Sequence, residues 1–91
     1  MLSGEYFIQE KNVRDDIFIK DISISGINFI TYKEHVFSKD DTIELKLALD
    51  DEMEHVIHVS AQIKWINDRN VGAQFTNPKL LEKDLRFYLQ I

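Results

Sequence analysis

The sequence contains no cysteine, which excludes disulfide bonds, thiolate metal ligands and cysteine nucleophiles. It has only three glycines and one proline, and it lacks a glycine-rich phosphate loop, a G-x-S-x-G motif and a His-Glu-x-x-His motif. No apolar run reaches the roughly 18 to 20 residues of a membrane-spanning helix, and the start of the chain does not resemble a signal peptide. These absences favour a cytoplasmic protein that is neither an enzyme nor inserted into a membrane, with no catalytic residue to assign.

The composition is that of one folded domain. The 91 residues are 44% hydrophobic and 30% charged, so residues 1–91 are predicted to form a single domain with a modest stability margin. The net charge of -5 argues against nucleic acid as a partner. This imbalance is concentrated in residues 34–55, which contain eight acidic and two basic side chains, so the remainder of the chain is nearly neutral.

Metal binding is not expected from the three histidines of the chain. His55 and His58 are three positions apart, a spacing that places them on opposite faces of a strand. The acidic run 50–52 lacks the spaced oxygen ligands and the glycine of a calcium-binding loop. The sequence therefore predicts no metal site and no resident cofactor.

Alternation of apolar and polar residues predicts that most of the chain is β-structure. In the run 56–66, Trp65 shares the parity of the buried-type residues and is expected in the core, as is Phe75. The polar segment 10–16 is expected to connect the first two strands. The second strand has apolar residues at both odd and even positions, so it is expected to be covered on both faces. The predicted strands are approximately 5–9, 17–23, 27–31, 42–49, 56–66 and 71–75.

The end of the chain changes to a helical period. Asn77 is a suitable N-cap, Pro78 stands at the first helical position, and apolar residues follow at spacings of three and four. A helix is therefore predicted at about 78–90. Six strands and one helix in so short a chain predict a mostly β fold, namely a small six-stranded antiparallel barrel with a C-terminal α-helix.

The run Asp21-Ile22-Ser23-Ile24-Ser25-Gly26 is a DxSxxG motif on a predicted strand. Together with the strand 61–65, the closing run Val71-Gly72-Ala73-Gln74-Phe75 and the terminal helix, it resembles the PilZ domain of bacteria over nearly the whole chain. The resemblance implies a six-stranded antiparallel barrel with a C-terminal helix. It also implies the ligand of that family, the second messenger cyclic di-GMP.

In the PilZ family the ligand site combines DxSxxG with an RxxxR motif that precedes the first strand. Asp21 would accept hydrogen bonds from the N–H edge of guanine, Ser23 would add another, and Gly26 would allow close approach to the backbone. Only three residues precede the first predicted strand, and no two arginines of this chain have the RxxxR spacing. Without arginine forks for the phosphates, binding of cyclic di-GMP is expected to be weak or absent.

Arg14 and the DxSxxG residues each have two alternative roles. Arg14, expected in the first loop, could swing toward the site, or it could pair with Asp15 or Asp16. The DxSxxG residues could also serve the backbone alone, with Asp21 and Ser23 satisfying a turn and Gly26 permitting a bulge or a close approach.

PilZ domains without the arginine motif are adaptors, so the resemblance implies a non-enzymatic module that binds another bacterial signalling or motility protein. The alternative is a working cyclic di-GMP receptor whose arginines come from Arg14, a partner subunit or an upstream segment. A homodimer is a further expectation, because the first strand could present a free edge. Candidate contact surfaces are the helix face at Lys79, Lys83 and Arg86 and the first-strand residues Tyr6, Phe7 and Ile8.

Overall fold

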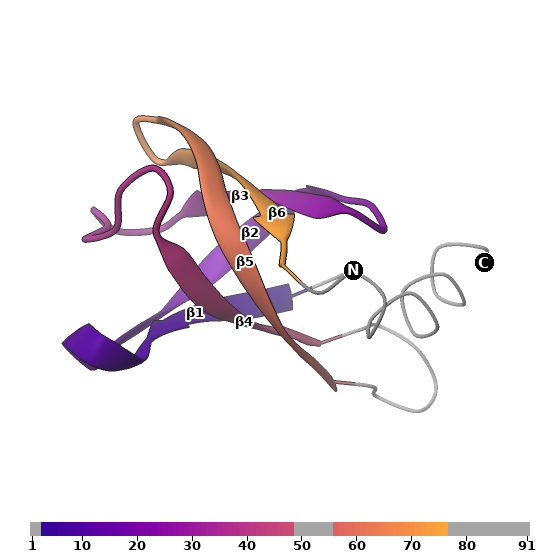
Figure 1. Ribbon diagram of the computed structural model, residues 1–91, viewed down its shortest axis with the longest axis horizontal. Helices are drawn as coiled ribbons and strands as arrows, with labels where there is room; N and C mark the ends of the chain where they lie inside the picture. Colours follow the sequence, from indigo (N-terminus) through magenta and orange to yellow (C-terminus); the bar gives the residue numbers. More distant parts are fainter. Residues whose placement is uncertain (1–2, 49–55, 77–91) are drawn as a thin grey trace.

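The computed structural model describes residues 3–48 and 56–76 (Figure 1). The predicted helix at 78–90, its face at Lys79, Lys83 and Arg86, and the acidic run 50–52 lie outside these ranges. Within them the chain forms antiparallel strands and one short 3-10 helix. The elements are β1 (Ser3–Ile8), η1 (Gln9–Lys11), β2 (Val13–Ile22), β3 (Gly26–Thr31), β4 (Thr42–Ala48), β5 (Val56–Asn67) and β6 (Asn70–Phe75).

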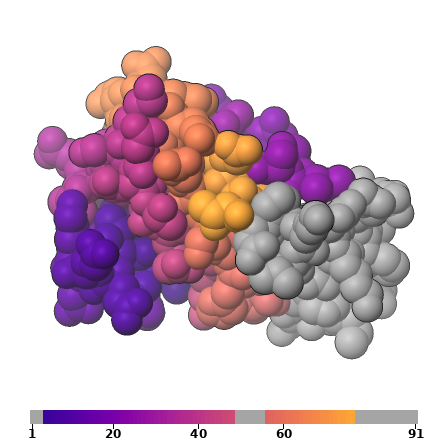
Figure 2. All heavy atoms as spheres, viewed as in Figure 1, coloured from indigo at the N-terminus to yellow at the C-terminus, as the bar shows by residue number. Residues whose placement is uncertain are grey.

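The strands close into a barrel in the order β1-β2-β3-β6-β5-β4, which confirms the predicted six-stranded antiparallel barrel. Figure 2 shows one face of it, across which β4 and β5 lie side by side. Closure requires β1 to pair with β2 on one side and with β4 on the other. The expectation that β1 offers a free edge to another chain is therefore wrong, because both of its edges are hydrogen-bonded within the barrel.

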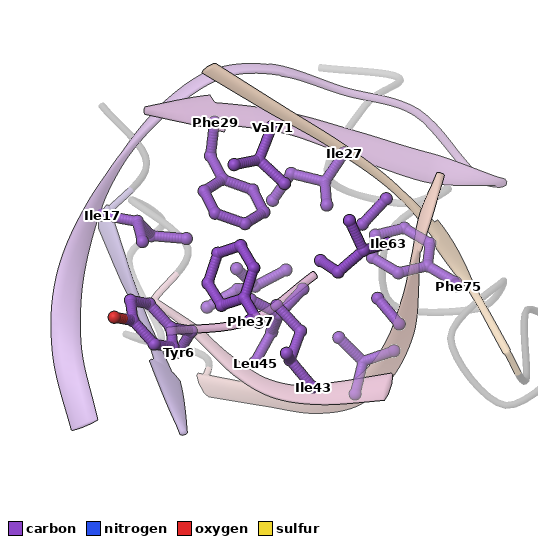
Figure 3. Packing of buried hydrophobic residues seen from close by; sticks show 14 of the residues in the cluster. Tyr6, Ile17, Ile27, Phe29, Phe37, Ile43, Leu45, Ile63, Val71 and Phe75 are labelled. Atoms are coloured by element: carbon purple, nitrogen blue, oxygen red, sulfur yellow. The ribbon is translucent and has the colours of Figure 1, made fainter. Parts of the chain in front are cut away.

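Alternating side chains of all six strands fill the interior of the barrel (Figure 3). In β4, for example, Ile43, Leu45 and Leu47 point inward and are almost fully buried. The core also contains Phe37, which lies between β3 and β4 in the sequence. Its ring packs edge-on against Tyr6, with ring centroids 5.2 Å apart, so a residue outside the strands helps to fill the barrel.

Burial along β1 contradicts one predicted contact surface. Tyr6 is only 2% exposed and Ile8 is buried as well, whereas Phe7 between them points outward and is half-buried. The run Tyr6-Phe7-Ile8 is apolar on both parities, so the sequence did not reveal which residues the barrel encloses. Pairing with β2 and β4 settles the parity and places Tyr6 and Ile8 inside.

The second strand is longer and more exposed than predicted. It begins at Val13, because Asn12 adopts a left-handed backbone conformation (φ 52°) that ends η1 and lets the chain reverse. Polar residues 14–16 are thus part of β2 and pair with β1, rather than forming a loop. The strand is not covered on both faces, since Phe18 is 47% exposed on the outside of the barrel.

Trp65 lies outside the core, contrary to the expectation from its parity, whereas Phe75 is buried as predicted. The pairing of β5 with β6 shifts between Ile63 and Trp65, at an irregularity that leaves Lys64 as an extra residue. An extra residue reverses the alternation of the strand beyond it. Trp65 is consequently turned outward and is 46% exposed.

Candidate nucleotide-binding site

The DxSxxG motif forms the tight connection between β2 and β3, which projects at the right of Figure 1. The backbone N–H of Ser23 donates to the Gly26 carbonyl at 2.9 Å. In return, the N–H of Gly26 donates to the hydroxyl oxygen of Ser23 at 3.3 Å. The side chain of Ser23 therefore satisfies the turn, which is the structural role that the sequence left open for it.

Gly26 is required by the close approach of β6. A Cβ at this position would come within 2.6 Å of the Ala73 carbonyl oxygen, which is closer than real Cβ atoms come to backbone. Just beside it, the N–H of Phe75 donates to the carbonyl of Ser25 at 2.9 Å. The glycine of the motif thus allows the β2–β3 hairpin to lie against β6, and its φ is not positive.

Asp21 lies at the end of β2, on the outer surface of the barrel, and its side chain is exposed. The pairing with β3 shifts between Ile19 and Asp21, so Lys20 is an extra residue and is exposed beside it. Among the described residues, Asp21 forms no hydrogen bond or ion pair. Its carboxylate oxygens are therefore available as acceptors for a donor such as the N–H edge of a purine.

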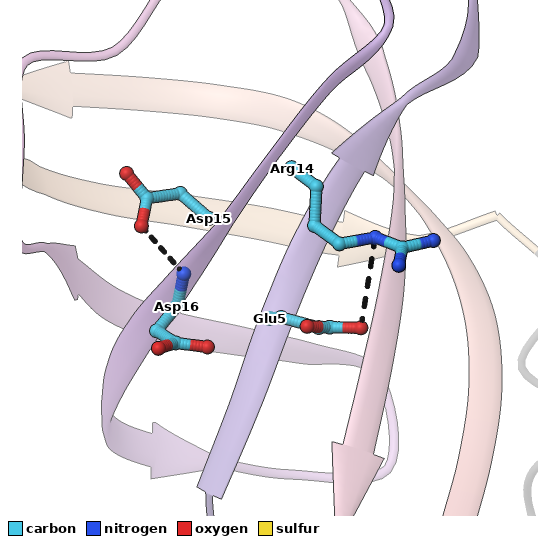
Figure 4. A network of polar contacts seen from close by, with 4 residues as sticks. All are labelled: Glu5, Arg14, Asp15 and Asp16. Carbon is cyan, nitrogen blue, oxygen red and sulfur yellow. Dashed lines mark hydrogen bonds and ion pairs between the residues drawn. The ribbon is translucent and has the colours of Figure 1, made fainter.

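Arg14 is not brought to the motif. It lies in β2, seven positions before Asp21, which corresponds to roughly 20 Å along a strand. Its Nε is 3.9 Å from a carboxylate oxygen of Glu5, not of Asp15 or Asp16 (Figure 4), and its guanidinium carbon lies 5.1 Å from the centre of the Phe7 ring. The predicted pairing of Arg14 with its acidic neighbours is wrong, because alternation along β2 and the register with β1 place Glu5 and Phe7 next to it.

Arg69 also lies away from the motif, in the turn between β5 and β6 at the upper left of Figure 1. Its guanidinium donates to the carbonyl of Tyr32 at 2.9 Å, and its own carbonyl accepts from the N–H of Thr31 at 3.0 Å. Thr31 and Gly26 are the two ends of β3, so Arg69 is held at the opposite end of that strand from the motif. Neither described arginine is therefore close to Asp21.

Trp65, which the sequence predicted to be in the core, lies on the outside of the barrel. It belongs to the same row of paired residues as Asp21. Asp21 pairs with Asn28, Asn28 with Gly72, and Gly72 with Trp65. The indole of Trp65 lies over Gly72, in the space that a side chain there would occupy. One signal in the sequence pointed to this arrangement: the inward parity of Val71 and Ala73 leaves Gly72 facing outward, as a bare position that a neighbouring side chain can cover.

The described residues offer hydrogen-bond acceptors and an aromatic surface, but no arrangement for a metal. Within residues 3–48 and 56–76, no three His, Cys, Asp or Glu side chains are grouped to hold an ion. In the same ranges, no helix has the length and apolar character needed to cross a bilayer. The exposed carboxylate and the hairpin hydroxyls can recognise donors, whereas the nearby exposed cation is a single lysine, Lys20.

The described residues form a small closed antiparallel β-barrel that carries DxSxxG where its second strand turns into its third. Comparison with known protein families matches residues 3–90 to the PilZ domain, so the chain belongs to the PilZ family. PilZ domains bind cyclic di-GMP or act as adaptors, which assigns this chain to signalling related to that messenger. None of the curated proteins compared with the sequence matches it.

Proposed function

We propose that this protein is a non-enzymatic PilZ adaptor that acts by binding another protein of a bacterial motility, pilus or biofilm system, and that its own nucleotide site is incomplete. The single observation that carries the proposal is the position of the two arginines that the structure describes. Arg14 and Arg69 are both engaged with other groups, away from Asp21. A cytoplasmic location is part of the same proposal.

The arrangement matters because the two phosphates of cyclic di-GMP need charge-assisted partners. Each such hydrogen bond contributes about 1.5 to 3 kcal/mol, and a forked guanidinium provides two of them to one phosphate. Lys20 is a single ammonium group next to Asp21, and lysine does not reproduce the planar fork of arginine. The described part of the site therefore supports recognition of a base edge more readily than tight binding of the whole dinucleotide.

The hairpin geometry supports the same interpretation. Ser23 already accepts the N–H of Gly26, and its hydroxyl lies 3.3 Å from that of Ser25. A ligand would have to share a hydroxyl that is engaged in the turn, whereas the exposed carboxylate of Asp21 has no partner within residues 3–48 and 56–76. The motif can thus be retained for the fold of the hairpin even where the messenger does not bind.

Isothermal titration calorimetry of the purified chain with cyclic di-GMP tests the proposal, with Asp21→Ala as the matched variant. We expect no saturable heat at millimolar ligand, and identical traces for the two proteins. Saturable heat that disappears in Asp21→Ala would overturn the proposal and establish a receptor.

The adaptor role itself requires a protein partner. Capture from the native cells should be followed by titration of each purified candidate against the purified chain. A saturable interaction with one candidate, unaffected by cyclic di-GMP, is the expected result. An interaction that appears only when cyclic di-GMP is present would contradict it, because a ligand-dependent module needs a working site.

A further inference from the structure

One wall of the barrel has no charged residue of its own. Neither β3 (GINFIT) nor β6 (NVGAQF) contains an acid or a base, although 30% of the whole sequence is charged. The two strands are paired with each other, so their outer surfaces form one continuous strip. We call this strip with its two flanking aromatic side chains the neutral face; it consists of Phe18, Asn28, Ile30, Trp65, Asn70 and Gln74.

The neutral face combines aromatic side chains with amides. Phe18 is 47% exposed on β2 and pairs with Ile30 of β3, while Trp65 reaches over Gly72 of β6 from the other flank. Between them lie Asn28, Asn70 and Gln74, whose side-chain amides form no hydrogen bond with another described residue. Depletion of charge and enrichment in aromatic residues distinguish the centres of protein interfaces from ordinary surface.

The indole of Trp65 is held in place before any partner arrives. The irregularity between Ile63 and Trp65 turns the side chain outward, and Gly72 provides the flat surface on which it lies. A tryptophan that is already fixed loses little rotamer freedom on binding, and tryptophan is among the residues that dominate interface energetics. The fold therefore already supplies much of the side-chain ordering that a contact including Trp65 would require.

Charge favours a second copy of this chain as the occupant. The protein carries a net charge of -5. A groove beside β1 and β4, on the other side of the barrel, is lined by four acids, Glu10, Asp40, Asp41 and Glu44, and by one base, Lys11. Two copies that met through those acids would repel each other, whereas β3 and β6 contribute no charge, and the exposed charges that border the face are Lys20 and Asp21 of β2 and Lys64 of β5. Amide side chains both donate and accept hydrogen bonds, so a surface bearing them can pair with itself across a two-fold axis.

Closure of the barrel decides how two copies can join. Because the barrel is closed and β1 has no free edge, two copies of the described barrel would join through side chains and not through strand pairing.

We propose that two copies of the chain form a two-fold dimer in which the neutral face of one, including Phe18 and Trp65, packs against the neutral face of the other. This dimer does not depend on the adaptor role proposed above, since it requires neither cyclic di-GMP nor another protein. A monomeric chain would overturn the dimer and leave the adaptor role untouched.

Sedimentation equilibrium over a wide concentration range tests the dimer. The decisive variant is Asn28→Asp with Gln74→Glu, which keeps the shape of both side chains but places two carboxylates on each copy. We expect the dissociation constant of the dimer to rise about tenfold or more, through like-charge repulsion, and to recover partly at high salt. Gln9→Glu is the matched control, because it is the same kind of change at an exposed position outside the face, and it should leave the dimer unchanged.

Phe18→Ser provides a second variant that removes apolar contact without adding charge, and it is also expected to weaken the dimer. Circular dichroism confirms that each variant is folded before its association is compared. A wild-type chain that stays monomeric at the highest concentration would overturn the proposal. So would a dimer that both the charged double variant and Phe18→Ser leave intact.

Discussion

The indole of Trp65 occupies the space in which a side chain at Gly72 would have to lie. The two residues pair across β5 and β6, and a Cβ built on Gly72 would overlap the five-membered ring of the indole. The glycine is therefore required by its neighbour and not by an unusual backbone conformation, since no glycine among the described residues has a positive φ. This contact also fixes the direction in which the exposed tryptophan points.

Gly72→Ala should displace the indole of Trp65 from β6. Because Trp65 is the only tryptophan of the sequence, its fluorescence reports the change directly. We expect emission at longer wavelength, stronger quenching by acrylamide, and a loss of about 1 kcal/mol in the free energy of unfolding.

Gln74→Ala is the control for this experiment, because Gln74 is an outward residue of the same strand that does not limit the position of the indole. Its emission should match the wild type. Unchanged emission in Gly72→Ala would show that the indole does not lie over Gly72.

Gly26→Ala should lower the free energy of unfolding more than Gly72→Ala does. A Cβ at position 26 meets the backbone of Ala73, which cannot move aside as the indole side chain can.

Ser23→Ala removes the oxygen that accepts the N–H of Gly26. We expect the free energy of unfolding in urea to fall by about 0.5 to 1.5 kcal/mol, the usual contribution of one hydrogen bond. Ser25→Ala is the matched control, because the Ser25 hydroxyl contacts only that of Ser23 among the described residues. Equal stability of the two variants would contradict a structural role for Ser23.

Tyr6 is expected to lower the free energy of unfolding at alkaline pH. Burial raises the pKa of its phenol above the usual value near 10, and the negative charge of the neighbouring Asp15 raises it further. The folded state then holds this proton more tightly than the unfolded state. The stabilising contribution is therefore fully present below about pH 10 and is lost as the pH rises through the folded-state pKa.

Tyr6→Phe should remove this part of the alkaline destabilisation. Urea unfolding at a series of pH values from neutral to strongly alkaline is expected to show a shallower decline for the variant than for the wild type. Tyr32→Phe, at an exposed position, should decline like the wild type. A variant that loses stability as steeply as the wild type would exclude Tyr6 as the group responsible.

Thr31→Val is expected to stabilise the barrel. The Thr31 side chain is 1% exposed, and its hydroxyl has no hydrogen-bond partner among the described residues. A buried hydroxyl without a partner is costly, so replacing it with a methyl group of similar size should raise the free energy of unfolding by about 1 kcal/mol. Thermal unfolding measures the change, and Thr42→Val, at an exposed position of β4, should show little effect. A lower melting temperature for Thr31→Val would indicate that the hydroxyl does have a partner.

Much of the fold could be predicted because alternation with a period of two is strong in this sequence. Polar and apolar residues alternate strictly over 42–47, and the predicted strand 42–49 matches β4 closely. Residues 10–16 were misinterpreted because their polarity suggested a loop, whereas pairing with β1 makes most of them strand. Polarity alone does not distinguish a loop from a strand whose outer face meets water.

The candidate site was predictable in its motif but not in its surroundings. DxSxxG was identified from six consecutive residues, and its local geometry depends mainly on those residues. The places of Arg14 and Trp65 depend on register, and the irregularities after Ile19 and Ile63 each shift the alternation by one residue. Nothing in the local pattern marks where an extra residue will be accommodated.

The sequence by itself determined the family, the number of strands and their order along the chain, and the residues of the DxSxxG motif, since these follow from local pattern and spacing. Only the tertiary structure decided that β1 has no free edge, that Arg14 pairs with Glu5, and that Trp65 faces outward over Gly72. The physical reason is that barrel closure and strand register are set by hydrogen bonds between residues far apart in the chain. One extra residue in a strand is enough to exchange the inside for the outside.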